Sequence, residues 1–216
     1  MDINEMNQRM KGRTPEQKKV IKYFYGEGGC LSFLSPGLKD EDYDAMVKDR
    51  VNSMNFKQKA LSKIGLDESQ VSEIEPVHFE GYWFDEKKTL AKWGKDRLWR
   101  SSAYQVTWIF FSSAQIYVYQ YTLNMDEDGK KEQTEEYFYK DITNFSTTSD
   151  TVEKHVLDKM SGCLGTGAPI YTRKNVDANR FAITVPGDKF LCSMDQNDYT
   201  ERAIQGMKAK LREKKG

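Results

Sequence analysis

The chain contains two histidines and three cysteines, the residue types from which many nucleophilic and metal sites are built. No Cys-x-x-Cys or His-Glu-x-x-His pair occurs, and no cysteine lies near His78 at the spacing that metal ligands require. The sequence therefore predicts no metal site. Cys163 follows His155 in a glycine-rich stretch, which makes this pair the best candidate for a cryptic cysteine hydrolase, with Cys30 as the other possible thiol. Because free cysteines are usually small apolar residues, Cys192, between apolar neighbours, is predicted to lie in the core.

Carboxylates are abundant but follow no catalytic pattern, and paired-acid catalysis stays open. Asp126, Glu127 and Asp128 lack the ligand spacing of a calcium loop and instead predict, with Gly129, a hairpin tip. The chain has no Gly-x-Ser-x-Gly motif, no dinucleotide fingerprint and no phosphate loop. The sequence therefore predicts a protein that is not an enzyme and needs no cofactor.

One connection, residues 85–100, places basic groups beside tryptophans, a combination that suits phosphate or an anionic membrane surface. Acidic residues interrupt the basic ones and weaken this field, so the alternative is a solvated loop whose tryptophans pack on the sheet. The candidate binding residues of this connection are Lys87, Lys88, Lys92, Trp93, Lys95 and Arg97.

The whole chain has 216 residues, with 38% hydrophobic and 12% aromatic content, enough to fill the core of one domain with an appendage. Lys plus Arg and Asp plus Glu both number 33, and this balance argues against a nucleic-acid-binding protein. The odd, widely spaced cysteines favour a reducing compartment, and the polar N-terminus shows no signal sequence. No window approaches the roughly 18 apolar residues of a membrane span, so we expect a cytoplasmic protein without a transmembrane segment.

The stretch from Leu98 to Phe145 predicts consecutive antiparallel strands. In residues 102–112, Tyr104 and Val106 alternate with polar residues, which is the signature of a strand with one buried face. In the next run, Tyr117 and the aromatic residues that alternate with it are expected on one face, and Ile116 and its partners on the other. Predicted strands span 77–84, 102–112, 115–124, 132–140, 142–147, 179–185 and 189–193.

Helical patterns flank these strands. Thr14 and Pro15 predict a helix start, and the spacing of apolar residues predicts helices over 40–54 and 56–64, the latter ended by Gly65. A short helix is expected over 151–160, followed by a glycine-rich loop. The last helix is expected to begin at a capping box of Asp198 and Glu201. These patterns divide the chain into an N-terminal helical extension, 1–72, and a second domain, 77–216.

The second half of the chain resembles bacterial pleckstrin-homology-like (PH-like) domains. The resemblance rests on the order of strands and turns, on the segment Tyr137–Thr147, on the hairpin Arg180–Met194 and on the closing helix. It implies an α+β fold: a seven-stranded, antiparallel, bent sheet or partly open barrel, capped by a C-terminal helix.

The resemblance also implies a binding or scaffolding module rather than an enzyme. We expect protein–protein interaction or self-assembly, which an exposed strand edge would permit. In lipid-binding relatives the loop after the first strand carries the basic residues, so anionic lipid bound at 85–100 is the alternative ligand, and the cryptic Cys/His hydrolase is the third possibility. Nucleic acid is not an expected partner.

Overall fold

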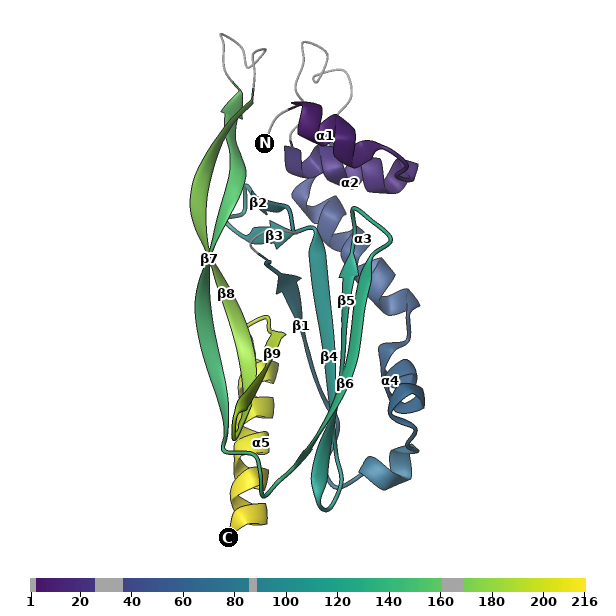
Figure 1. Cartoon of the computed structure of the whole chain (residues 1–216), viewed down its shortest axis with the longest axis vertical. Coiled ribbons are helices and arrows are strands. Elements are labelled where there is room, and N and C mark those ends of the chain that lie inside the picture. The colour runs from purple at the N-terminus through teal and green to yellow at the C-terminus, as the bar shows by residue number, and fades with distance from the viewer. Residues whose placement is uncertain (1–2, 26–36, 86–88, 161–168) are drawn as a thin grey trace.

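The computed structural model describes residues 3–25, 37–85, 89–160 and 169–216, which form an elongated α+β molecule (Figure 1). Its five α-helices are α1 (Ile3–Met10), α2 (Pro15–Tyr25), α3 (Asp40–Ser53), α4 (Phe56–Ile64) and α5 (Asp198–Lys215), with a 3₁₀ turn, η1, at Glu68–Val71. Its strands are β1 (Val77–Trp83), β2 (Ala91–Trp93), β3 (Trp99–Ser101), β4 (Ala103–Phe111), β5 (Gln115–Asn124), β6 (Lys130–Phe138), β7 (Asn144–Met160), β8 (Pro169–Val185) and β9 (Asp188–Ser193).

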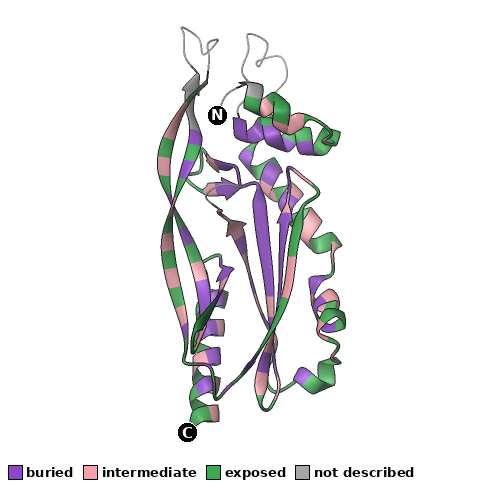
Figure 2. Ribbon diagram, viewed as in Figure 1, coloured by how far each residue is buried: buried purple, intermediate pink, exposed green. Residues whose placement is uncertain are grey.

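A four-stranded antiparallel sheet in the order β1-β4-β5-β6 forms the centre of the molecule. Both of its faces are covered, and Figure 2 shows buried residues along nearly the whole length of β4 and β5. The predicted alternation is confirmed: Tyr104 and Val106 pack on one face, while Ile109, Ile116 and Val118 pack on the other. Strands with two covered faces read as long apolar runs, and the end of β4 has this character.

Helices α1 to α4 cover the first face of the central sheet and share a hydrophobic core with it. Tyr43 of α3 is fully buried in this layer, stacks on Tyr23 at 4.7 Å and donates a hydrogen bond to the Ser101 carbonyl at 2.7 Å. The predicted helix ends are confirmed for α2, where the Thr14 hydroxyl accepts from the Gln17 amide, and for α4, where Gly65 has φ 78°. The helical extension is therefore docked along the sheet.

The second face of the central sheet is covered by a three-stranded sheet, β7-β8-β9, and by α5. Ile204, Met207 and Leu211 of α5 join the same buried cluster as Phe79 and Phe181. At the far end of α5, Glu73 binds Lys210 and Lys214 at 2.7 and 2.8 Å. The helix starts one residue earlier than predicted, because Asn197 and Thr200 form the capping box. The Asn197 side chain accepts a hydrogen bond from the backbone N–H of Thr200, and the Thr200 hydroxyl accepts one from the backbone N–H of Asn197.

The predicted helix over 151–160 is wrong, because these residues belong to β7, which pairs with β8 in a long twisted ribbon. The predicted strand 179–185 lies within β8, and the predicted strand 142–147 lies within β7 only from Asn144 onward. Val152 and Val156 face inward at strand spacing, with Lys154 buried between them. A lysine at an inward position hides the alternation in the sequence, and only the folded chain explains it: its ammonium donates to the carbonyls of Asp85 and Thr89.

A second difference concerns the connection 85–100, which was expected to be a loop. It contains a two-stranded sheet, β2-β3, which pairs Ala91 with Ser101 and Trp93 with Trp99. The architecture is thus α+β with mostly antiparallel sheets and a C-terminal helix, and the sheets do not close into a barrel. Within the described residues, no helix combines the length and apolar character that crossing a bilayer requires.

Candidate functional site

The basic connection contributes fewer free cations than its sequence suggests. Lys87 and Lys88 lie outside the described residues. The Lys92 ammonium is 3.3 Å from Asp40 and 3.6 Å from the centre of the Tyr23 ring, and burial lowers its pKa. It therefore holds the β2-β3 hairpin against the N-terminal helices.

The tip of this hairpin is exposed. Trp93 is 43% exposed and Leu98 is 59% exposed, and the side chains of Lys95 and Arg97 lie between them in the sequence, also exposed. The Trp93 ring packs on Trp99 with 5.0 Å between centroids. Of the predicted binding residues, Trp93 and Arg97 also line an aromatic pocket beside α3.

A buried arginine, which the sequence analysis did not single out, organises the same region. Arg100 is 1% exposed and binds Asp44 of α3 through two hydrogen bonds of 2.8 and 2.6 Å, and Asp96 through two of 2.9 and 2.6 Å. Side chains at the hairpin and on α3 are thus joined by one charge network. Residue 94, next to this network, must be a glycine, because a Cβ at that position would overlap the Arg100 guanidinium.

The structure gives the thiol and imidazole candidates no common site among the described residues. Cys192 is buried, as predicted, and burial raises its pKa to about 12, the opposite of an activated thiol. His155 is exposed on β7, and His78 stacks on Trp108 at 4.9 Å. Cys30 and Cys163 lie outside the described residues. Nor do the described histidines, cysteines and carboxylates form a group that could hold a metal ion.

The acidic hairpin tip between β5 and β6 docks the N-terminal helices. Asp126 binds Arg9 at 2.7 Å, Glu127 binds Arg13 at 3.0 Å, and Asp128 accepts a hydrogen bond from the side-chain amide of Gln17 at 2.6 Å. The prediction of a hairpin tip is confirmed, and its carboxylates have protein partners.

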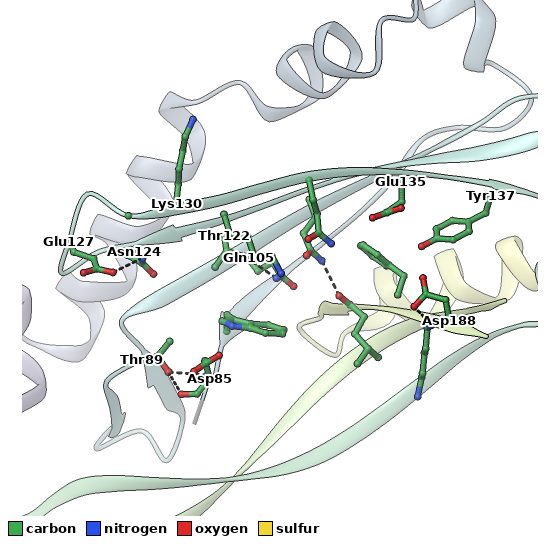
Figure 3. Close-up of a pocket in the computed structure, with 18 residues that line it drawn as sticks. Asp85, Thr89, Gln105, Thr122, Asn124, Glu127, Lys130, Glu135, Tyr137 and Asp188 are labelled. Carbon is green, nitrogen blue, oxygen red and sulfur yellow. Dashed lines mark hydrogen bonds between the residues drawn. The ribbon is translucent and has the colours of Figure 1, made fainter. Parts of the chain in front are cut away.

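A cavity with a largely polar lining lies between the two larger sheets, and we refer to it as the inter-sheet cleft (Figure 3). It has a volume of about 580 Å³. The described residues that line it are Trp83, Asp85, Thr89, Gln105, Gln120, Thr122, Asn124, Glu127, Gly129, Lys130, Lys131, Gln133, Glu135, Tyr137, Asp188, Lys189, Phe190 and Leu191.

Buried amides form the floor of the inter-sheet cleft. Gln105 donates to the Thr122 hydroxyl at 2.9 Å and accepts from the Ser193 amide at 2.7 Å. Gln120 donates to the Leu191 carbonyl at 3.0 Å. These two glutamines are 2% and 3% exposed, and they satisfy the backbone of β9 where it crosses the central sheet.

The wall of the cleft is β6, an edge strand of the central sheet. Strand alternation directs Lys131, Gln133, Glu135 and Tyr137 toward the cleft, so its lining carries both signs of charge. Figure 3 shows Glu135 and Asp188 on its two sides. The described lining offers hydrogen-bond donors, acceptors and charges, but no cysteine, serine or histidine nucleophile. Such a surface can bind a polar chain.

The sequence carries a signal for this cleft that was not used as a site prediction. Gln105 and Gln120 occupy inward positions beside Thr107 and Thr122, on strands that also place apolar residues such as Ile109 and Val118 on this face. A polar residue at a core position needs a buried partner or a lined cavity. Which of the two it has depends on where β9 lies, and that is a property of the tertiary structure.

Comparison of the chain with family models, with curated proteins and with solved structures gives no match. Function is therefore inferred from the geometry of the chain's own residues.

Proposed function

We propose that the protein is a non-catalytic binding module that takes an extended segment of a partner protein in its inter-sheet cleft. The observation that carries this proposal is the position of β6, an edge strand whose inward side chains line a polar cleft of about 580 Å³. An edge strand presents unpaired backbone groups to which an extended peptide can add, and neighbouring side chains then select its sequence. Charges along β6, such as Lys131 and Glu135, discourage unselective strand pairing.

The order of elements supports a PH-like module. A four-stranded meander (β1, β4, β5, β6) precedes a three-stranded one (β7, β8, β9), and α5 closes the chain against both. The β2-β3 hairpin and helices α1 to α4 are additions to that plan. The free, buried thiol of Cys192 supports a reducing compartment, for which we propose the cytoplasm.

The test is a selection from a random peptide library displayed on phage against the full-length chain. We expect enriched peptides with dissociation constants on the order of micromolar, as is common for strand addition at one edge. Glu135→Lys should weaken these peptides or change the charge of those selected. Glu136→Lys is the matched control, because the neighbouring side chain points to the other face of β6 and contacts Gln115. A library without enrichment, or equal effects of both substitutions, would contradict the proposal.

A second copy of the chain is another possible occupant of the β6 edge. Static light scattering across a concentration series distinguishes the two cases: self-assembly should raise the average mass, and Glu135→Lys should abolish that rise. A mass that stays monomeric at all concentrations leaves the partner segment as the ligand.

Binding to an anionic membrane surface is the second candidate function, and the exposed tip of the β2-β3 hairpin favours it. Trp93 and Leu98 are exposed there beside Lys95 and Arg97, and tryptophan and cations suit a lipid interface. Sedimentation with phosphatidylserine vesicles should then occur at low ionic strength and decline steeply with added salt. Equal binding to neutral vesicles, or none at low salt, would exclude this role.

A further inference from the structure

A second cavity, of about 540 Å³, lies between α3, the β2-β3 hairpin and the segment after β9; we refer to it as the aromatic pocket. Its aromatic lining comes from Tyr82, Phe84, Trp93, Trp99 and Tyr104. Tyr82 and Tyr104 meet edge to face at 5.3 Å, and the indoles of Trp93 and Trp99 are 5.0 Å apart. The pocket is thus lined by several π systems and is partly open to solvent at Trp93.

A carboxylate without an ion-pair partner in the described chain faces this cavity. Asp195 is an exposed residue, but its carboxylate packs against β1: a Cβ added to Gly81 would lie only 3.0 Å from Asp195 Oδ1. Burial and the neighbouring Glu80 raise the pKa of Asp195 to about 6, and Lys48 opposes this shift. The other pocket carboxylate on this side, Asp44, is already engaged by Arg100 and by the Tyr82 hydroxyl at 2.6 Å.

The protein uses the same combination of groups elsewhere to hold a cation of its own. The Lys92 ammonium lies over the Tyr23 ring at 3.6 Å and beside the Asp40 carboxylate at 3.3 Å. An aromatic face attracts a cation through its quadrupole, and a carboxylate adds a charge-assisted contact. In the aromatic pocket both groups are present, and a cavity takes the place of the lysine.

We propose that the aromatic pocket binds an organic cation, either an ammonium or a guanidinium group. Asp195 supplies the negative charge in the pocket lining, the neighbouring Glu80 adds to it, and the aromatic residues enclose the cation. The cations already at the pocket leave this charge available, because Arg100 is neutralised by two aspartates and Lys48 and Arg97 are exposed side chains that solvent screens. The cation belongs either to a small molecule or to a lysine or arginine side chain of a partner.

This site is independent of the inter-sheet cleft. Tyr82 and Tyr104 lie on the face of the central sheet that carries the helices, whereas Gln105 and Gln120 line the cleft on the opposite face. Failure of either proposal would therefore leave the other unaffected.

Titration of the full-length protein with choline, and separately with acetyl-lysine methylamide, tests the proposal. The indole N–H resonances of Trp93 and Trp99 report occupancy in ¹⁵N-correlated spectra. The neutral control is 3,3-dimethylbutanol, which has the shape of choline without its charge. We expect saturable shifts with either cation and at least a roughly tenfold weaker response to the alcohol, equivalent to about 1.4 kcal/mol. Equal responses to choline and the alcohol, or no shift with either cation, would overturn the proposal.

Two substitutions assign the binding to these residues. Asp195→Asn keeps the shape and removes the charge, so choline should bind about tenfold more weakly, equivalent to about 1.4 kcal/mol. Trp93→Ala, at a half-exposed position, should weaken binding severalfold without unfolding the chain. Asp188→Asn in the inter-sheet cleft is the control and should change nothing. Unchanged affinity in both test variants, with folding verified by circular dichroism, would refute the assignment.

The relative affinities of the two cations identify the source. If the lysine derivative binds more tightly, the ligand is a side chain of a partner protein. If choline binds more tightly, the ligand is a free quaternary ammonium compound. Either result supports a cation site.

Discussion

Arg100 should be one of the most sensitive positions in the protein, because its buried guanidinium makes four hydrogen bonds that join Asp44 of α3 to Asp96 of the β2-β3 hairpin. Its guanidinium is almost fully buried, and it makes bonds of 2.8 and 2.6 Å to Asp44 and of 2.9 and 2.6 Å to Asp96. The side chains of Asp44 and Asp96 keep 33% and 37% exposure. The carboxylates can therefore be rehydrated when the arginine is removed, whereas the arginine cannot be rehydrated when a carboxylate is removed.

This asymmetry sets the magnitudes. Breaking a buried ion pair by removing one partner costs about 3–5 kcal/mol when the remaining charge is fully buried. Arg100→Met leaves only half-exposed carboxylates, so we expect a loss of about 2–3 kcal/mol in the free energy of unfolding. Asp44→Leu leaves the buried guanidinium with Asp96 alone, and a loss of about 3 kcal/mol is expected.

A double-mutant cycle separates the pair from its surroundings. The double variant Arg100→Met/Asp44→Leu should be less destabilised than the sum of the single variants, with a coupling energy of about 2 kcal/mol. The coupling between Arg100 and Asp96 should be smaller, about 1 kcal/mol, because that pair is local in sequence and can form in the unfolded chain as well.

Urea unfolding followed by tryptophan fluorescence and by far-UV circular dichroism gives these free energies. Hydrogen exchange of α3 amides provides a second measurement, since the loss of the Asp44 contact should increase exchange there before the central strands respond. A coupling energy under about 0.5 kcal/mol between Arg100 and Asp44 would place the pair among ordinary surface ion pairs and refute the reasoning.

Three further predictions concern other parts of the molecule. Gly94→Ala should cost about 1–3 kcal/mol in stability, because the added Cβ would overlap the Arg100 guanidinium. Gly206→Ala in α5 should instead stabilise the protein by about 0.5–1 kcal/mol, because no atom lies within 4 Å of the added Cβ and alanine favours the helix. Thermal unfolding of both variants measures the two effects. Hydrogen bonds from Lys210 and then Lys214 lower the pKa of Glu73 to about 2, so its contribution is present above the unfolded pKa of 4.5 and disappears as the pH falls toward 2. Acid unfolding of Glu73→Gln should lack this contribution, and an NMR titration in which Glu73 titrates normally would contradict it. Deletion of residues 1–72 should expose the aromatic face of β4 and β5 and give an aggregating product in size-exclusion chromatography. A monodisperse, folded 73–216 fragment would show that the sheet does not need the helices.

Local patterns were sufficient for the elements whose faces are uniformly apolar or polar. Tyr117 and Ile116 were assigned to opposite faces of β5 from alternation alone, and the face assignment is confirmed by the two buried clusters. Thr14 and Gly65 marked helix ends because capping is a local interaction of a side chain or a left-handed residue with the adjacent backbone.

The same reasoning failed where a residue's environment comes from a distant segment. Lys154 made residues 151–160 resemble an amphipathic helix, but its ammonium is satisfied by carbonyls that precede β2. Lys92 was a candidate ligand-binding residue, but its ammonium already forms an ion pair with Asp40 and a cation–π contact with Tyr23. No local pattern encodes these partners.

The sequence by itself determined the alternation of β4 and β5, the helix ends at Thr14 and Gly65, and the balance of charge, because each depends on near neighbours or on composition. Only the tertiary structure decided which charges are free, that two sheets leave a polar cleft, and that aromatic side chains from α3's side of the sheet surround a cavity near Asp195. The physical reason is that a charge or an aromatic ring acquires its role from what lies within a few ångströms of it, and chain folding brings those neighbours from far along the sequence.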